Sequence, residues 1–294
     1  MNGAMSICRA SSGKDRKMGN KKVWFVTGCS KGLGKALVEE LIAQGYYVIG
    51  TSRSRESLEK VFGTESESFL PLTMNVKEET DVKKAVESGL AKFGRIDVIV
   101  NNAGYTHLAT IEEMSDVDAR EEFDINVFGL LNVIRSVLPV MRKQKSGHIF
   151  NVSSLGAYNV GPLSGIYCAT KHAVKAISET LAQEVKEFGI HVTDVKPGFM
   201  RTEFFGSSYK TTAPEGSPYK HLYDENMEFY MGQNGNQIGD PKKAAKLYIE
   251  VAEMENPYES LPMGTDCCDG IHDICAGTVK LMEDMRSVAE TTNY

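Results

Sequence analysis

The chain has 294 residues, of which 41% are hydrophobic and 24% charged, an ordinary globular composition. Its net charge of −6 disfavours a nucleic-acid-binding surface, which needs clustered basic side chains. No run approaches the roughly 18 apolar residues of a membrane span. The first residues lack the apolar core of a secretory signal, so the six cysteines predict reduced thiols in a cytoplasmic protein.

The first 20 residues are expected to be a disordered lead-in. Five basic residues lie between Lys14 and Lys22, and the segment has no hydrophobic period. A chain that starts at Met18 is therefore expected to keep its melting temperature and its activity.

Six near-continuous apolar runs then predict strands buried on both faces, at residues 23–27, 47–52, 69–74, 96–101, 148–153 and 190–196. Helical spacing of apolar residues fills the gaps between them, for example over 33–42 and 173–188. Alternation of strand and helix predicts right-handed crossovers and an α/β fold with a doubly wound parallel sheet.

The region after Pro197 has a different character. Residues 199–238 are rich in glycine, serine and aromatic residues and lack a clear period. A helix is expected over about 241–254, a short edge strand over 261–264, and a final helix to about residue 290. Residues 21–294 are thus predicted to be one domain, with a helical substrate lid at about 199–238.

A glycine-rich loop, TGCSKGLG, joins the first strand to the first helix. Backbone N–H groups at a helix N-terminus, without side chains in the way, suit a pyrophosphate. The spacing, Gly28, Gly32 and Gly34, differs from the commoner Gly-x-Gly-x-x-Gly pattern. A plain tight turn is the alternative interpretation.

The end of the second strand indicates which dinucleotide binds. NAD-binding chains usually place an acid there for the ribose 2′-OH. This chain has Arg53 and Arg55 there, with no acid before Glu56, and Lys31 adds a cation in the loop. Cations without a carboxylate favour a 2′-phosphate, hence NADP(H). Solvated charges at the start of a helix are the alternative.

Tyr167 and Lys171 are four residues apart in a helical run and share one face of it. An ammonium beside a phenol favours the phenolate and lowers its pKa, which makes the phenol usable in proton transfer. An accidental surface pair is the alternative for this motif taken alone.

Several motifs together resemble the classical short-chain dehydrogenases/reductases. They are the glycine loop, NNAG at 101–104, KPGFMRT at 196–202, and a tetrad in the family's order: Asn126, Ser154, Tyr167 and Lys171. Ser154 precedes Tyr167 by 13 residues, the usual spacing in that family. The resemblance covers about residues 22–255 and implies a Rossmann fold.

The resemblance implies a role for each tetrad residue. Tyr167 is the expected acid in carbonyl reduction and base in alcohol oxidation. Lys171 is expected to bind the nicotinamide ribose and, with the positive nicotinamide ring, to lower the phenol's pKa. Ser154 is expected to hydrogen-bond the substrate oxygen, with Ser153 as the alternative, and Asn126 to hold a relay water.

The expected cofactor-binding residues come from every motif. They are Gly28, Ser30, Lys31, Gly32, Leu33, Gly34, Arg53, Asn75, Val76, Asn102, Ala103, Gly104, Tyr167, Lys171, Pro197, Gly198 and Thr202. Asn75 departs from the family, which usually has Asp before the valine; an amide oxygen can still accept from the adenine amino group.

No metal site is predicted. Cys267, Cys268, His272 and Cys275 lie within nine residues, but zinc ligands usually come as two spaced pairs. Cys168 is expected to pack the helix.

The expected activity is hydride transfer between NADP(H) and a carbonyl or secondary alcohol. Aromatic residues and methionines of the lid, with Leu155, Tyr158, Val160 and Leu163 opposite, favour a medium-to-large apolar substrate, unless they only pack the lid. A homodimer or homotetramer is expected through helices around 118–138 and 165–188. A non-catalytic NADP(H)-sensing regulator and a sugar-nucleotide epimerase or dehydratase are the alternatives.

Overall fold

The computed structural model describes residues 21–203, 209–211 and 213–294. The expected lead-in of residues 1–20 therefore lies outside the described residues. The centre of the molecule is a seven-stranded sheet with the order β3-β2-β1-β4-β6-β7-β9. Its strands are β1 (Val23–Val26), β2 (Tyr47–Ser52), β3 (Phe69–Thr73), β4 (Val98–Asn101), β6 (Gly147–Val152), β7 (Ile190–Pro197) and β9 (Ser260–Met263).

Every neighbouring pair in this sheet is parallel. The strands lie close to the six predicted runs, and the short edge strand β9 pairs with β7 as expected. Strands β1 and β4 are buried along their whole length because helices cover both faces. The doubly wound parallel sheet predicted from the sequence is confirmed.

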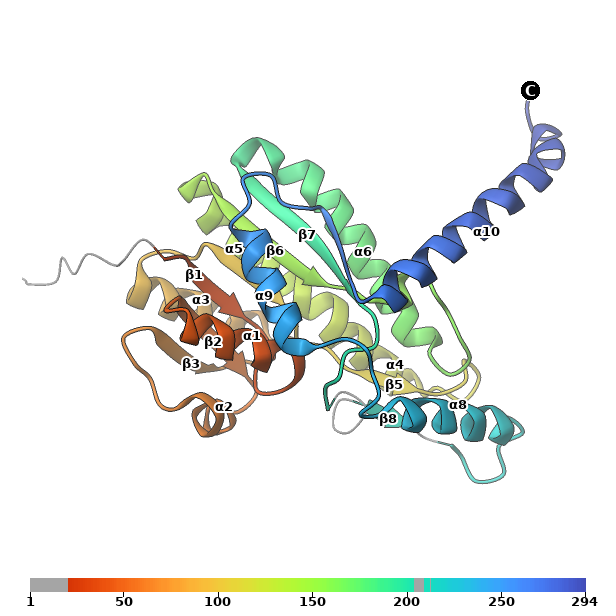
Figure 1. Ribbon diagram of the computed structural model, residues 1–294, viewed down its shortest axis with the longest axis horizontal. Helices are drawn as coiled ribbons and strands as arrows, with labels where there is room; N and C mark the ends of the chain where they lie inside the picture. The colour runs from red at the N-terminus through yellow and green to blue at the C-terminus, as the bar shows by residue number, and fades with distance from the viewer. Residues whose placement is uncertain (1–20, 204–208, 212) are drawn as a thin grey trace, which may run out of the picture.

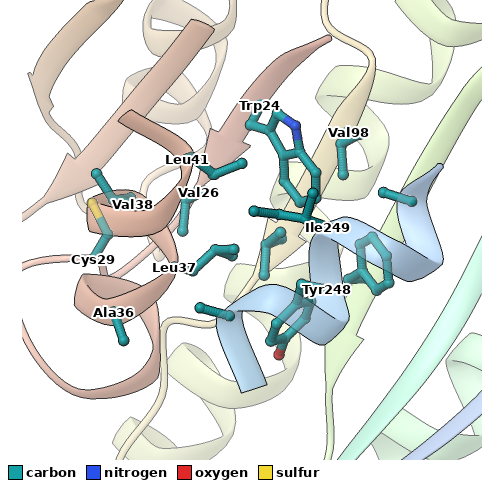
Figure 2. Close-up of a cluster of buried hydrophobic side chains, with 14 of the residues drawn as sticks. Trp24, Val26, Cys29, Ala36, Leu37, Val38, Leu41, Val98, Tyr248 and Ile249 are labelled. Atoms are coloured by element: carbon teal, nitrogen blue, oxygen red, sulfur yellow. The ribbon is translucent and has the colours of Figure 1, made fainter. Parts of the chain in front are cut away.

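Two layers of helices enclose the sheet (Figure 1). One layer comprises α1 (Gly32–Ala43) and α9 (Pro241–Ala252); the other comprises α3 (Glu79–Phe93), α5 (Leu130–Gln144) and α6 (Gly165–Val185). The short helix α2 (Arg55–Phe62) follows β2. Figure 2 shows the core on the first face, where Trp24 lies between side chains of α1 and α9 such as Leu41 and Ile249.

The chain reverses its winding direction at β1, whose neighbours β2 and β4 lie on opposite sides of it. Crossovers to the left and right of this point leave a crevice at the carboxyl ends of the strands, which is where open α/β sheets bind ligands. The glycine loop follows β1 directly and therefore lies at this crevice.

The lid has more regular structure than its sequence predicts. A second sheet pairs β5 (Thr106–Leu108) with β8 (Tyr209–Thr211), and α8 (Lys220–Gln233) follows. Tyr223 of α8 packs against Leu108 and Leu163. This long-range contact anchors a helix whose own apolar residues do not form a clear stripe, so periodicity did not reveal it.

A broken helix crosses the second face of the sheet. It begins as α4 (Asp116–Phe123), passes through a π-helical turn, η1 (Asp124–Gly129), and continues as α5. The stretch Asp116–Gln144 is long and apolar enough to cross a membrane by length and composition, and 44% of its most apolar window is buried in the protein. Its inner face packs on the sheet through Val133, Val137 and Met141, as a core helix does.

The last helix, α10 (Thr265–Glu290), begins in contact with the body and then projects away from it (Figure 1). Cys267 in its first turn is fully buried, whereas every residue from Cys275 to Glu290 is exposed. Helix α10 ends at Glu290, close to the predicted end at about residue 290.

Candidate active site

The glycine loop forms a cradle that side chains would fill. Gly28 has a φ of +63°, and a Cβ there would lie 2.8 Å from the Ala103 Cα. A Cβ on Gly34 would lie 2.5 Å from the Asn102 side-chain nitrogen. Gly32 also has a left-handed φ, of +60°, and begins α1. The loop therefore leaves backbone N–H groups and a helix N-terminus facing the crevice, which fits a dinucleotide pyrophosphate.

The NNAG segment holds this cradle in place. The Asn102 side chain donates to the carbonyl oxygens of Thr27 and Gly28, both at 3.0 Å. The Thr27 hydroxyl accepts from the backbone N–H groups of Asn102 and Ala103, also at 3.0 Å. Thr27 was not predicted as a site residue, although it directly precedes the loop. Its hydroxyl fixes the carboxyl end of β4 against that of β1.

Two cations lie at the far end of the crevice. Lys31 and Arg53 both line the cavity described below. Burial lowers the pKa of Lys31, the nearby charge of Arg53 lowers it further, and Glu203 opposes both. Two like charges held close together favour a bound anion between them.

Arg55 does not belong to this pair, which corrects the prediction that it contributes. Its Nε donates to the Glu59 carboxylate at 2.7 Å, and its guanidinium lies 3.5 Å from Glu65. Glu59 and Glu65 thus balance the charge of Arg55, and its guanidinium lies outside the crevice.

Asn75 and Val76 line the cavity beside the glycine loop, as the predicted adenine contact requires. The Asn75 side-chain oxygen accepts from the backbone N–H of Lys77 at 3.3 Å. An amide oxygen has two lone pairs, so it retains the capacity for one further donor.

The Tyr167 and Lys171 side chains meet on α6, as their spacing predicts. The Lys171 Nζ lies 5.6 Å from the centre of the Tyr167 ring and donates to the Val152 carbonyl at 2.9 Å. Burial lowers the pKa of Lys171 to about 8, against the carboxyls of Glu122 and Asp194, which raise it. The end of β6 therefore fixes the ammonium beside the phenol.

The pKa of Tyr167 differs from the sequence-based expectation. Burial raises it above its ordinary value, while a hydrogen bond with the Ser154 side chain lowers it in part. The ammonium of Lys171 does not reverse this effect in the protein alone. Spacing along a helix predicts a neighbour but not the solvent exclusion that the rest of the fold imposes.

The structure separates the two candidate serines. Both residues line the cavity, but they differ in what their hydroxyls bind. The Ser154 Oγ accepts from the Gly156 N–H at 3.0 Å. Ser153 is buried, and its hydroxyl donates to the Val195 carbonyl at 3.1 Å. Only Ser154 has its hydroxyl beside Tyr167, as its spacing indicates.

Asn126 lies on the π-helical turn and is 2% exposed. Its side-chain NH₂ donates to the Tyr105 carbonyl at 2.9 Å and to the Thr170 hydroxyl at 3.1 Å, and its oxygen accepts from the Tyr105 N–H at 3.1 Å. Both of its donors are thus occupied by protein atoms. The expected relay water remains a prediction. It would bind to the second lone pair of the Asn126 side-chain oxygen or to the Asn126 backbone.

An acid from the other end of the chain fixes the loop after β7. The Asp266 carboxylate, at the start of α10, accepts from the Phe199 N–H at 2.6 Å. A Cβ on Gly198 would lie 2.4 Å from the same carboxylate. Pro197, Gly198 and Thr202, which are expected to bind the cofactor, line the cavity. Asp266 was not predicted, because 68 residues of sequence separate it from Gly198.

The glycine loop, the cations Lys31 and Arg53, and the side chains of Ser154, Tyr167 and Lys171 open into one cavity of about 890 Å³, whereas Asn126 and Asp266 do not line it. It extends from Arg53 and Asn75, past Tyr167 and Lys171, to the lid. Its apolar wall comprises Leu155, Val160, Phe199, Met200, Phe229 and Tyr230. A cavity of this size and apolar lining is typical of a small-molecule binding site.

Two predicted wall residues lie elsewhere. The Tyr158 ring lies under the ammonium groups of Lys175 and Lys196, and Leu163 packs against Tyr223. Tyr219 and Tyr223 also pack the lid onto the core, so the lid's aromatics divide between packing and the cavity. The predicted wall residues Phe204 and Phe205 lie outside the described residues.

The buried cysteines have packing environments. The Cys168 thiol is buried and donates to Ser164 Oγ at 3.4 Å, and burial raises its pKa. The Cys267 thiol donates to the Lys196 carbonyl at 3.0 Å, whereas Cys268 and Cys275 are exposed. Among the described residues, no group of three metal-binding side chains occurs.

The fold and site define a dinucleotide-binding oxidoreductase of the doubly wound α/β class. The family model for short chain dehydrogenases matches residues 22–213, and the chain belongs to this family. The oxidoreductase BOA17 of Botryotinia fuckeliana is 38% identical over 251 residues, which are 84% of this chain and 90% of that protein. A 3-ketodihydrosphingosine reductase of Bacteroides thetaiotaomicron is 38% identical over 238 residues, 80% of this chain and 85% of that one.

Solved structures show the same likeness. A short-chain dehydrogenase from Streptomyces avermitilis has a TM-score of 0.84 at 32% identity and covers 92% of this chain and all of its own. A serine dehydrogenase complexed with NADP⁺ has a TM-score of 0.71 at 25% identity and covers 83% of this chain and 95% of its own.

Proposed function

We propose that the protein is an NADP(H)-dependent oxidoreductase that interconverts a carbonyl and a secondary alcohol. The observation that supports it is one continuous cavity, which joins the cationic pair Lys31 and Arg53 to Tyr167, Lys171 and Ser154. The bound cofactor would supply the hydride; the protein positions the reactants and moves the proton.

The residues divide the remaining work among them. Ser154 donates a hydrogen bond to the substrate oxygen, where negative charge develops during reduction. Tyr167 gives its phenolic proton to the same oxygen and takes it back in oxidation. Lys171, anchored to the Val152 carbonyl, holds the ribose hydroxyls and supplies a positive charge that favours the phenolate. Asn126 fixes the Tyr105 backbone beside them.

Replacement of Tyr167 by Phe tests this mechanism, because it removes only the hydroxyl. We expect Tyr167→Phe to keep cofactor affinity and to lose nearly all turnover, and Lys171→Ala to lose both. Turnover is followed by NADPH absorbance, and cofactor binding by fluorescence. A Tyr167→Phe protein with full activity would rule the mechanism out, and a fully intact protein without turnover on any carbonyl would favour a non-catalytic sensor.

The preference for NADP(H) over NAD(H) is proposed from Lys31 and Arg53, with support from relatives. The serine dehydrogenase and ElxO structures, at 25% and 26% identity, contain NADP. We expect Arg53→Asp to weaken NADPH binding strongly and to leave NADH binding similar or improved. Arg55→Ala is the matched control, because its guanidinium already binds Glu59. Equal wild-type affinities for the two cofactors would contradict the proposal.

The proposed substrate is a medium-to-large apolar ketone or secondary alcohol. The support is the apolar wall, where Phe199, Phe229 and Leu155 face the cavity, and a relative named 3-ketodihydrosphingosine reductase. We expect a higher kcat/KM for a bulky apolar ketone than for a short polar or anionic one. Faster turnover of the small polar ketone would contradict it.

We further propose a cytoplasmic homodimer or homotetramer. Support comes from Val117 and Phe128 on the α4-η1-α5 segment, which are 76% and 52% exposed, and from the free state of all five described cysteines. Light scattering of the wild type and of Phe128→Glu tests the assembly, and cell fractionation tests the compartment. A wild-type monomer at micromolar concentration would contradict the first proposal, and recovery with membranes the second.

A further inference from the structure

A buried carboxyl lies behind the catalytic residues and has no role in the mechanism above. Glu122 of α4 is 0% exposed. Within the described part of the chain, neither of its oxygens makes a hydrogen bond of ordinary geometry. A carboxyl in this condition is costly in a fold unless it stays neutral or acts in proton transfer.

Glu122 belongs to a polar row that leads inward from the surface. Asp118, Glu122 and Asn126 follow one another at intervals of four residues, so they share one face of α4 and its π-helical continuation. We name these three residues the α4 row. The Asp118 side chain is 28% exposed, whereas Glu122 and Asn126 are 0% and 2% exposed. The row thus connects solvent with the tetrad.

Strand β5 packs against this row with polar groups. The His107 ring, 3% exposed, has its Nδ1 3.4 Å from the Asp118 carboxylate. The Thr106 hydroxyl and the His107 amide lie close enough to the Glu122 carboxyl to lower its pKa. Thr106 also lines the catalytic cavity. Hydroxyl and imidazole groups that adjoin carboxyls are the usual carriers of protons through protein.

The inner end of the row reaches the catalytic ammonium. A Cβ on Gly104 would lie 3.0 Å from the Asn126 side-chain oxygen and 3.7 Å from the Lys171 Nζ, so these two groups flank the same glycine. When Glu122 is ionised, its negative charge raises the pKa of both Lys171 and Tyr167.

We propose that Glu122 is a proton-holding residue of the relay, which connects Tyr167 and Lys171 with solvent at Asp118 along the α4 row. The inference rests on the proposed function. In reduction, Tyr167 gives its proton to the substrate oxygen and recovers one by way of Lys171, which would also hold the ribose of the bound cofactor. The Glu122 carboxyl supplies that proton and becomes a carboxylate, which takes one proton from solvent through Asp118 and His107. In oxidation, the proton that Tyr167 takes from the alcohol travels through the same groups in the opposite direction and is released to solvent.

The charged and titratable groups around Glu122 set when it can act. They are Tyr105 and His107 on the β5 side, Tyr167, Cys168 and Lys171 on α6, and Asp118 and Glu121 on its own helix. Burial raises the pKa of Glu122 to about 8, although Lys171 opposes the effect. Glu122 is therefore protonated at neutral pH and ready to donate in reduction.

The test compares Glu122→Gln with the wild type, with Asp116→Asn as the control, since Asp116 is an exposed acid on the same helix that pairs with Arg120. In the wild type, kcat for reduction falls above a pH of about 8. In Glu122→Gln, kcat at neutral pH falls roughly 10-fold, less than the 10²–10⁴-fold of direct proton transfer. The share of the alkaline decline that comes from Glu122 is lost, the share that comes from Lys171, whose pKa is also about 8, remains, and the solvent deuterium isotope effect on kcat increases. Asp116→Asn behaves as the wild type.

An infrared titration of the protein without cofactor tests the carboxyl independently of activity. The band of a protonated carboxyl disappears near pH 8 in the wild type and is absent in Glu122→Gln. The infrared titration does not depend on turnover. If the protein turned over no carbonyl, that result would contradict the proposed function but not the protonation of Glu122. If Glu122→Gln does not fold, Asp118→Asn shows the slower proton delivery. Unchanged kcat, pH profile and isotope effect in the folded Gln variant, or in Asp118→Asn, or no band that titrates, overturns the inference.

Discussion

Replacement of Gly28 by alanine perturbs the cofactor cradle at one defined point. Gly28 has a φ of +63°, and an alanine in this region is strained by roughly 1–2 kcal/mol. Its Cβ would lie 2.8 Å from the Ala103 Cα, about 0.7 Å closer than the roughly 3.5 Å of a favourable carbon contact. Such overpacking adds about 1–3 kcal/mol. The expected loss in unfolding free energy is therefore about 2–5 kcal/mol.

The relief of this contact must come from the loop. Ala103 is fixed by the bond from its N–H to the Thr27 hydroxyl, at 3.0 Å. The backbone N–H groups of the loop therefore move away from the pyrophosphate position. We expect an affinity for the dinucleotide at least about tenfold weaker, or about 1.4 kcal/mol.

Gly45→Ala is the matched control. Gly45 has a φ of +76° and nothing within 4 Å of an added Cβ, so it has the backbone strain without the contact. Urea denaturation and a fluorescence titration with NADPH measure the two losses. Gly45→Ala is expected to lose about 1–2 kcal/mol and to keep its affinity. Equal losses of stability and unchanged affinity in both variants would refute the reasoning.

Three further outcomes follow from the site. Ser154→Ala is expected to lower kcat by roughly 100-fold or more, whereas Ser153→Ala, whose hydroxyl bonds to β7, changes stability and leaves kcat nearly intact; a reversed order in steady-state assays would exchange their roles. Asp266→Asn weakens the bond to the Phe199 N–H and is expected to raise KM severalfold for cofactor and substrate, at a nearly unchanged far-ultraviolet circular dichroism spectrum. Burial raises the pKa of Glu122 from 4.5 to about 8, so the folded chain keeps a proton that the unfolded chain releases. The unfolding free energy of the wild type should therefore fall, relative to that of Glu122→Gln, as the pH rises from 4.5 to about 8. Parallel curves of unfolding free energy against pH would contradict this prediction.

Local patterns were enough to predict the sheet and the shared helical face of Tyr167 and Lys171, whereas Asn126 and Ser154 came from the family resemblance. Each buried strand has a continuous apolar run, and the Tyr167 and Lys171 spacing of four residues fixes a shared helical face. The glycine loop was predictable for the same reason, since Gly28 and Gly32 follow the first strand directly.

Features set by distant residues were not predictable. Arg55 binds Glu59 one helical turn further on, and the distant Glu65, in the loop before β3, adds a second carboxylate at 3.5 Å. Asp266 reaches the segment after β7 only because β9 brings the start of α10 beside it. The pKa of Tyr167 depends on how completely the surrounding elements exclude water, which no spacing in the sequence encodes.

The outer turns of the projecting helix α10 are expected to unfold locally, at a lower free-energy cost than the body of the protein. Val279, Leu281 and Met285 are 57%, 54% and 45% exposed, so tertiary contacts contribute little to its outer turns. Most of the stability of a helix in a protein comes from tertiary packing, and the amide hydrogens of these outer turns therefore exchange with solvent by local fraying. Amides of the central strands exchange only when the whole domain opens. A spectroscopic label on the exposed Cys275 would thus report a transition that a melting curve of the body does not contain.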